Sequence, residues 1–200
     1  MSVRSYGLFV CDLQTRFRTI IRNFPLVLRS SQTLIDISNK LNIPICVTEQ
    51  NPSKLGNTCP ELTEKLNLSK DVIILPKMQF SMITEEVNTF ITRNGFDTVI
   101  LCGIEGHVCI QQTALDLLDR GVNVIIPLES VSSQRAEDLD ASLRLLLQRG
   151  ATVTTVESAV MTILKSADHP QFRDVMKIMI KHTEDVKELR SSPTTINKLE

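Results

Sequence analysis

Tryptophan is absent from this 200-residue chain, and aromatic residues make up only 4% of it. Proteins that bind single-stranded nucleic acid stack bases on aromatic side chains, and the sequence has little material for such a platform. Charge of one sign is not in excess either, because 22 Lys and Arg residues face 23 Asp and Glu residues and the net charge is −1. We therefore expect neither a nucleic acid nor an anionic membrane surface as a partner.

Long hydrophobic runs are missing as well. No run approaches the roughly 18 apolar residues of a membrane-spanning helix. The first strand-like run, Tyr6–Cys11, begins so early that no signal peptide fits before it. The chain also has no G-x-G-x-x-G motif and no P-loop, which excludes the commonest sites for dinucleotides and nucleotide phosphates. These absences predict a cytoplasmic protein without membrane attachment.

The cysteines form no C-x-x-C pair, and their number, five, is odd. This pattern argues against a disulfide framework and favours a reducing compartment. Cys11, Cys46 and Cys102 lie inside apolar runs, where a thiol behaves as a small buried hydrophobic group. Cys59 lies in a polar loop, and the pattern assigns it no role. Cys109 differs from these, because it follows a small-residue turn and opens a helical pattern.

Continuous apolar runs alternate with amphipathic helical patterns along the chain. Continuous rather than alternating apolarity is typical of strands that are covered on both faces. Three junctions repeat one form, in which Gly95, Gly121 or Gly150 ends a helical pattern and a β-branched run follows. The alternation predicts one α/β domain of the three-layer, Rossmann-like kind, with a six-stranded parallel sheet and helices on both faces.

The expected domain covers residues 1–180, and the charged segment 181–200 is interpreted as a loosely held polar tail. Pro170 is expected to start the last helix, which would end at Ile180. Ser81 is the expected N-cap of a helix that runs to about Asn94. Residues 49–60 are expected to form a long loop.

Polar residues at the carboxyl ends of the strands are candidates for catalysis, because function gathers at that edge of a parallel α/β sheet. Asp12 follows the first strand, Lys77 ends the third, and Cys109 follows the turn after the fourth. A helix N-terminus and a nearby Lys77 ammonium both favour the thiolate form of Cys109. Asp12 can take the thiol proton, or hold Lys77 charged, and then protonate a leaving amine. Together the three residues predict a cysteine nucleophile with its acid–base partner.

Each of these residues also has a purely structural interpretation. Asp12 could cap the turn after the first strand, Lys77 could be a solvated surface lysine, and Cys109 could be a core residue. His107 is close to Cys109 in sequence, but residues two apart on a helix do not face each other. A papain-like Cys/His pair is therefore disfavoured, and so is a zinc site, since no suitable cluster of His and Cys is present.

Three ordered motifs resemble one family: CDLQ at residues 11–14, PKMQFS at 76–81 and GIEGHVCIQQTALDLLDRG at 103–121. Over residues 6–165 the chain resembles the isochorismatase-like cysteine hydrolases, and is most similar to the isochorismatase domain-containing proteins of eukaryotes. It also resembles trypanosomatid proteins labelled mitochondrion-associated ribonuclease, which adds mitochondrial association and RNA cleavage as alternatives. A catalytically silent, oligomeric scaffold of the same fold is a further alternative.

The resemblance implies a catalytic triad of Asp12, Lys77 and Cys109. It implies a cis peptide between Ile104 and Glu105, with the backbone N–H groups of Glu105 and Cys109 forming an oxyanion hole. The implied reaction is acyl transfer, in which Cys109 attacks an amide-like carbonyl, ammonia or an amine leaves, and water hydrolyses the thioester. A homo-oligomer, either a dimer or a larger assembly, is implied as well. The residues expected to line the substrate pocket are Gln14, Phe17, Gln50 and Phe80.

Two departures from the family narrow the chemistry. Nicotinamidases of the family bind a metal through a D-x-H motif after the second strand, where this chain reads TEQNP at residues 48–52. We therefore expect no metal, no other cofactor and no nicotinamidase activity. Isochorismatases that cleave a vinyl ether lack the cysteine, whereas Cys109 is present here, which argues against ether hydrolysis. The expected substrate is a small molecule with an amide-like C–N bond.

Overall fold

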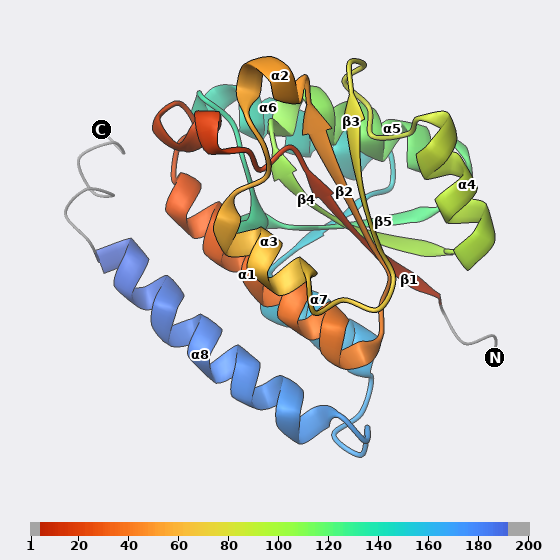
Figure 1. Cartoon of the computed structure of the whole chain (residues 1–200). Helices are drawn as coiled ribbons and strands as arrows, with labels where there is room; N and C mark the ends of the chain where they lie inside the picture. Colours follow the sequence, from red (N-terminus) through yellow and green to blue (C-terminus); the bar gives the residue numbers. More distant parts are fainter. Residues whose placement is uncertain (1–4, 192–200) are drawn as a thin grey trace.

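The computed structural model describes residues 5–191, which form a parallel sheet with helices on both of its faces (Figure 1). The strands lie in the spatial order β3-β2-β1-β4-β5-β7, and the two-residue strand β6 pairs with β4. The α/β prediction is confirmed. The predicted count of six strands omitted β6, because two residues are too few to carry a periodic pattern. The strands are β1 Tyr6–Cys11, β2 Ile45–Gln50, β3 Val72–Lys77, β4 Thr98–Ile104, β5 Asn123–Pro127, β6 Val131–Ser132 and β7 Thr152–Thr154.

Two hydrophobic cores lie on opposite faces of the sheet, and each is closed by its own set of helices. Helices α1, α3, α7 and α8 contribute to one core, whereas α4, α5 and α6 contribute to the other (Figure 1). No helix within residues 5–191 is both long and apolar enough to cross a membrane. The helices are α1 Phe24–Leu41, α2 Pro52–Leu55, α3 Pro60–Leu66, α4 Glu85–Asn94, α5 Gln111–Asp119, α6 Ala136–Gln148, α7 Val156–Leu164 and α8 Phe172–Ser191, with short helical turns at Thr15–Thr19 (η1), Gly106–Ile110 (η2) and Leu128–Ser130 (η3).

Strand β1 shows why the apolar runs are continuous. Its side chains alternate between the two cores, with Leu8 and Val10 in one and Phe9 and Cys11 in the other. All six residues of the strand are buried. A strand in this position needs apolar residues on both faces, and it therefore lacks the polar alternation of a half-exposed strand.

The predicted C-terminal tail is wrong for the residues that the structure describes. Helix α8 does not end at Ile180 but continues through Lys181 to Ser191. His182, on this extension, is buried, and its Nδ1 lies 3.1 Å from the Thr33 hydroxyl of α1. The extension is polar on its outer side and is held by α1, which local composition could not reveal. The rest of the predicted tail, 192–200, lies outside the described residues.

Two further boundaries differ from the predictions. Helix α4 begins after Thr84, whose hydroxyl accepts a hydrogen bond from the backbone N–H of Val87 (3.4 Å). Ser81, the predicted N-cap, instead accepts from the N–H of Ile83 (3.1 Å) in the turn before the helix. The expected loop 49–60 contains the end of β2 and the short helix α2.

Candidate active site

The carboxyl ends of β1, β3 and β4 bring Asp12, Lys77 and Cys109 together. Asp12 leaves β1 with φ of 53°, a left-handed conformation that Asp tolerates better than most residues. Lys77 is the last residue of β3, and Cys109 lies in the helical turn η2 that follows β4. All three side chains are buried, with exposures of 1% for Asp12, 4% for Lys77 and 7% for Cys109. The interpretation of Lys77 as a solvated surface residue is therefore wrong.

Asp12 and Lys77 form a buried ion pair. The Nζ of Lys77 lies 2.8 Å from Oδ2 of Asp12. The other carboxylate oxygen, Oδ1, accepts a hydrogen bond from the Thr48 hydroxyl at 2.8 Å. Both oxygens of the carboxylate therefore have a partner, which is what a buried charge requires.

The Lys77 ammonium has further partners that fix its position. It donates to Oε1 of Gln50 (2.6 Å) and to the backbone carbonyls of Phe80 (3.0 Å) and Gln79 (3.2 Å), and it lies 3.7 Å from Sγ of Cys109. Burial lowers the pKa of Lys77, but the neighbouring acidic groups outweigh burial, so the net shift of that pKa is upward. The lysine is therefore a fixed positive charge between a carboxylate and a thiol.

The backbone around Cys109 is held by hydrogen bonds to the carbonyl of Glu105. The N–H groups of Val108 and Ile110 both donate to the carbonyl of Glu105, at 3.1 Å each. The peptide bond between Ile104 and Glu105 is cis. The carboxylate of Glu105 accepts from the backbone N–H of Gln134 (3.1 Å), which ties this turn to the segment before α6.

Gly103 in β4 is what allows β1 and β4 to approach each other here. It pairs with Cys11 in the register of the two strands and has φ of 118°. A Cβ atom at this position would lie 2.0 Å from the carbonyl oxygen of Cys11. Any side chain would push the turn that carries Cys109 away from Asp12.

Comparison with known proteins shows the family of this chain. Residues 6–158 match the model of the isochorismatase domain. The chain belongs to the isochorismatase family. A secreted isochorismatase effector, Isc1, of Phytophthora sojae is 39% identical over 177 residues, which cover 88% of this chain and 84% of that protein. Isochorismatase domain-containing protein 2 of Xenopus laevis is 37% identical over 183 residues, 91% of this chain and 87% of that protein.

A solved structure also matches. The MAR1 ribonuclease from Caenorhabditis elegans superposes with a TM-score of 0.85 at 38% identity, covering 90% of this chain and 92% of that one. The three-layer architecture described above is thus the architecture of the isochorismatase family. The fold expected from the sequence and the family expected from its motifs are both confirmed.

The four predicted pocket residues lie in different environments. Gln14 is fully buried, and its amide bridges two loops by bonding the backbone of Gln50 (2.8 and 3.0 Å) and the carbonyl of Gly56 (2.5 Å). Gln50 contacts Lys77 directly. Phe17 is half-buried and packs against the core beneath α1, whereas Phe80 is 58% exposed. The Gln14 side chain is taken up by hydrogen bonds between loops, and Phe17 by packing against the core. Gln50 and Phe80 are therefore the stronger candidates for lining the pocket.

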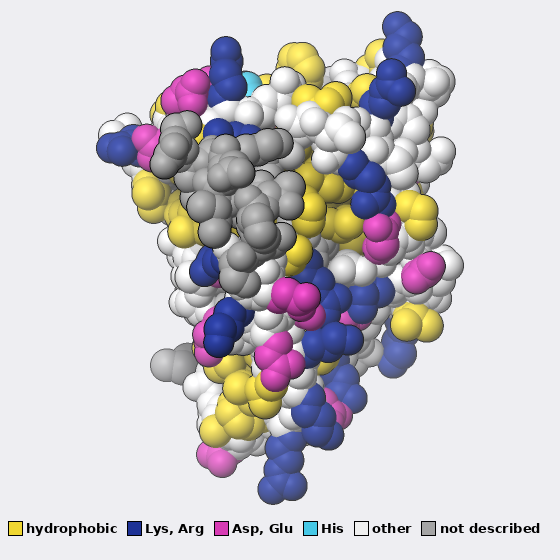
Figure 2. All heavy atoms as spheres, turned by 90° about the vertical axis from the view of Figure 1, so that its left-hand side faces the viewer, with side chains coloured by type: hydrophobic (Ala, Val, Ile, Leu, Met, Phe, Trp, Pro, Cys, Tyr) yellow, Lys and Arg dark blue, Asp and Glu magenta, His cyan; other side chains and the backbone are white. Residues whose placement is uncertain are grey.

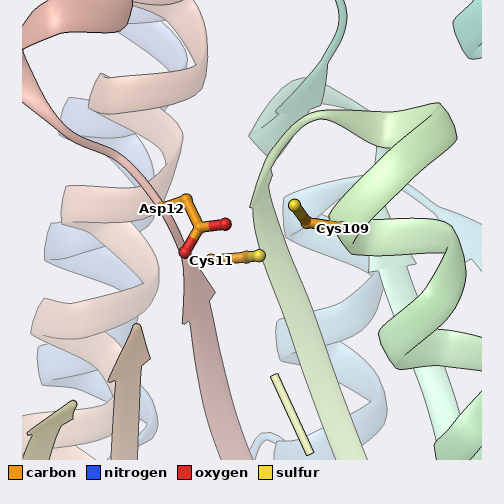
Figure 3. A group of neighbouring side chains, drawn as sticks. All are labelled: Cys11, Asp12 and Cys109. Atoms are coloured by element: carbon orange, nitrogen blue, oxygen red, sulfur yellow. The ribbon is translucent and has the colours of Figure 1, made fainter. Parts of the chain in front are cut away.

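Two further residues lie beside the triad, although the sequence pattern assigned neither of them a role there. Thr48 bonds Asp12, and Cys11 brings a second thiol to the site (Figure 3). Cys11 is fully buried, as expected for a small apolar group, but its position directly before Asp12 was a signal that it also reaches the site. Thr48 likewise lies near the end of its strand, β2.

The groups around the site do not suit a divalent metal. Cys11, Asp12 and Cys109 each offer one possible ligand atom, and these three atoms lie within 4.8 Å of one another, close enough to surround a metal ion. The Lys77 ammonium, however, already pairs with Asp12 and lies beside Cys109, so a cation would meet a fixed positive charge. Glu49, near the place of the D-x-H motif, is buried and accepts from the N–H and hydroxyl of Thr58.

Proposed function

We propose that this protein is a metal-independent cysteine hydrolase that cleaves a small amide-like C–N substrate through a thioester on Cys109. The observation that carries the proposal is the buried Lys77 ammonium, 2.8 Å from the Asp12 carboxylate and 3.7 Å from the Cys109 sulfur. A fixed cation beside a thiol stabilises negative charge on the sulfur. A carboxylate beside the same cation supplies a proton acceptor within the site.

The proposed reaction begins when Cys109 passes its proton to Asp12 and the sulfur attacks the substrate carbonyl. The resulting oxyanion accepts hydrogen bonds from the N–H groups of Glu105 and Cys109. Asp12 then returns the proton to the leaving nitrogen as the C–N bond breaks, which leaves a thioester. A water molecule gives a proton to Asp12 and attacks the thioester. The Cys109 sulfur leaves as the acid is released and takes that proton back from Asp12, which restores the starting thiol and carboxylate.

Lys77 acts throughout by staying in place. Its bonds to Gln50 and to the carbonyls of Gln79 and Phe80 prevent the ammonium from moving out toward solvent when the sulfur changes charge. A preorganised charge of this kind costs no reorganisation during the reaction. Gln50 is therefore a positioning residue for Lys77 in this mechanism.

The proposal is tested by screening small primary amides and related C–N compounds for released ammonia or amine. Cys109→Ala should reduce turnover to background, Asp12→Asn should lower it by about 10²- to 10⁴-fold, and Lys77→Met by about 10²-fold or more. Intact-mass measurement should detect an acyl group on Cys109 in the wild type. Cys102→Ala, which removes a buried thiol on the opposite face of the sheet, is the control and should leave the rate unchanged.

A catalytically silent scaffold is the second candidate, and the low exposure of the triad is what favours it. A substrate must reach Cys109, which is only 7% exposed. If the wild type turns over no compound in the screen and Cys109 reacts with no small electrophile, the scaffold interpretation replaces the hydrolase. A rate that survives Cys109→Ala would equally contradict the proposed mechanism.

Cleavage of RNA is the third candidate, because the Caenorhabditis elegans relative is named a ribonuclease. The histidine closest in sequence to the site, His107, faces Ser133 (3.0 Å) and Asp138 (3.8 Å). On the face shown in Figure 2, Asp and Glu side chains lie beside the Lys and Arg side chains. RNA cleavage that is lost in Cys109→Ala would support this candidate, whereas cleavage that persists without Cys109 and Asp12 would point to another site.

A further inference from the structure

The second thiol at the site has no part in the proposed hydrolysis. Sγ of Cys11, a carboxylate oxygen of Asp12 and Sγ of Cys109 all lie within 4.8 Å of one another. Figure 3 shows the Cys11 side chain at the end of β1 with its sulfur directed toward Cys109, and Asp12 beside both. Cys11 is fully buried, whereas Cys109 keeps 7% exposure. Cys109 is thus the less completely buried thiol of the pair, and Cys11 lies within reach of it.

We propose that this pair is a reversible redox site, in which a hydroperoxide oxidises Cys109 and Cys11 resolves the product as a Cys11–Cys109 disulfide. The residues are 98 positions apart in sequence, but the pairing of Cys11 with Gly103 in β1 and β4 brings the following turn back over Cys11. A disulfide requires sulfurs about 2 Å apart, with the two Cβ atoms about 4 Å apart. The two sulfurs lie within 4.8 Å of each other, so formation of the bond requires the two side chains to move closer.

The first step is a two-electron oxidation of the Cys109 sulfur. The thiolate attacks one oxygen of the hydroperoxide, an S–O bond forms, the O–O bond breaks, and the leaving oxygen takes up a proton to become an alcohol or water. The product is a sulfenic acid on Cys109.

In the second step the Cys11 sulfur attacks the Cys109 sulfur. An S–S bond forms, the S–O bond breaks, and Asp12 transfers the Cys11 proton to the departing hydroxyl, which leaves as water. The sum is two thiols and one hydroperoxide giving one disulfide, one alcohol or water, and one further water. A dithiol reductant reverses the change by exchange.

The charges around the two thiols favour Cys109 as the thiol that is oxidised and Cys11 as the thiol that resolves the product. Burial raises the pKa of the Cys11 thiol, and its contact with Cys109 and the Asp12 charge raise that pKa further, although Lys77 opposes them. Cys11 therefore stays protonated and unreactive in the reduced protein. Conversion of Cys109 to a neutral sulfenic acid removes one of the influences that keep Cys11 protonated. Oxidation of Cys109 therefore makes it easier for the Cys11 thiol to lose its proton and attack.

The position of the other thiols makes Cys102 a matched control. Cys102 is also fully buried and lies in β4, opposite Val10 of β1. Its side chain belongs to the core on the other face of the sheet, whereas Cys11 and Cys109 share one core. If only the distance between strands mattered, either Cys11 or Cys102 could form a disulfide with Cys109. Because only Cys11 lies on the same face of the sheet as Cys109, we expect the disulfide to form with Cys11.

The experiment treats the reduced full chain with hydrogen peroxide, alkylates the remaining thiols and determines the masses of the peptides. Trypsin together with a Glu-specific protease cuts after Glu105, which separates Cys102 from Cys109. In the wild type we expect a linked Cys11–Cys109 peptide, with three of the five cysteines still alkylated, and full recovery of all five with dithiothreitol. Cys102→Ala should give the same linkage.

The variants at Cys11 make the proposal falsifiable without any enzyme assay. In Cys11→Ala and Cys11→Ser, whose folding is checked by circular dichroism, Cys109 should proceed to the sulfinic or sulfonic acid and fail to recover with dithiothreitol. In Cys109→Ser, Cys11 should remain reduced. The proposal is overturned if wild-type Cys109 is over-oxidised as fast as in Cys11→Ala, or if Cys109 pairs with another cysteine. Because the readout is the mass of the chain, it is independent of whether the protein hydrolyses an amide.

Discussion

Exposure separates the five cysteines of this protein into two kinds. Four of them, Cys11, Cys46, Cys59 and Cys102, have no exposed surface, whereas Cys109 keeps 7% exposure. Burial raises the pKa of the Cys59 thiol to about 11 and that of Cys102 to about 12, and it raises the pKa values of Cys11 and Cys46 as well. These four thiols are therefore neutral and inert at neutral pH.

We predict that iodoacetamide at neutral pH alkylates Cys109 well before the other four cysteines. The physical reason is that a thiol must be both exposed and able to ionise in order to react, and the four buried thiols fail on both counts. Peptide mass spectrometry at successive times measures the order of labelling. The control is Lys77→Met, in which labelling of Cys109 should slow because the neighbouring positive charge is lost. Equal rates at Cys109 and Cys59 would contradict this prediction.

The connection from β4 to η2 is the element on which the site depends. It is fixed at one end by Gly103, which lies against the backbone of Cys11. It is fixed at the other end by Gly106, whose carbonyl accepts a hydrogen bond from the Ser142 hydroxyl of α6 (2.8 Å). A Cβ on Gly106 would lie 2.4 Å from Leu139, so α6 also packs closely on this turn. The turn is held from β1 and from α6 at once.

We predict that Gly103→Ala destabilises the protein by more than about 4 kcal/mol, because the new methyl group collides with the backbone of β1 and cannot avoid it by a side-chain rotation. Gly121→Ala is the matched control. Gly121 also has positive φ, at 76°, but no atom lies within 4 Å of its added Cβ, so only the backbone cost of about 1–2 kcal/mol applies. Urea unfolding of both variants measures the difference. Similar losses in the two variants would show that the approach of β1 and β4 is not the limiting contact.

Helix α8 forms an additional layer outside the helices that cover the sheet. It lies outside α1 (Figure 1), where Val175 and Met179 are buried and where Lys40 pairs with Asp174 at 2.6 Å. Arg29 of α1 also pairs with Asp185. His182 is buried in the same interface, and burial lowers its pKa. The helix is therefore part of the folded domain and not a tail.

We predict that the free energy of unfolding decreases as the pH falls from about 7 to 5, and that His182 is responsible for part of this decrease. The folded-state pKa of His182 is lower than the value near 6.5 of an unfolded histidine, so the unfolded chain binds the proton more readily. The stabilising contribution is present above the unfolded pKa and is lost as the pH falls toward the folded one. Urea unfolding across this range should show a weaker pH dependence in His182→Gln. An unchanged dependence would contradict the assignment. His169→Gln, at a half-buried position, is the control.

The assembly and the cellular location of the protein are properties of the whole molecule. A dimer or larger homo-oligomer and a cytoplasmic location stay predictions from the sequence. Sedimentation of the purified protein and imaging of the tagged chain are the measurements that decide them.

Local sequence determined the alternation of strands and helices and the three residues of the candidate triad. Apolar runs and glycine stops are local signals, and in a parallel sheet the residues that follow successive strands reach the same edge. Asp12, Lys77 and Cys109 could therefore be selected together without knowledge of any contact between them.

Tertiary structure alone decided what lies beside those residues. Gln14, a predicted pocket residue, ties two loops together, and Cys11 lies in the core as expected but also close to Cys109. The extension of α8 to Ser191 depends on α1, against which its sparse apolar residues are buried. Each of these outcomes rests on partners far away in sequence. Packing selects such partners through shape and charge, and no periodicity along the chain encodes them.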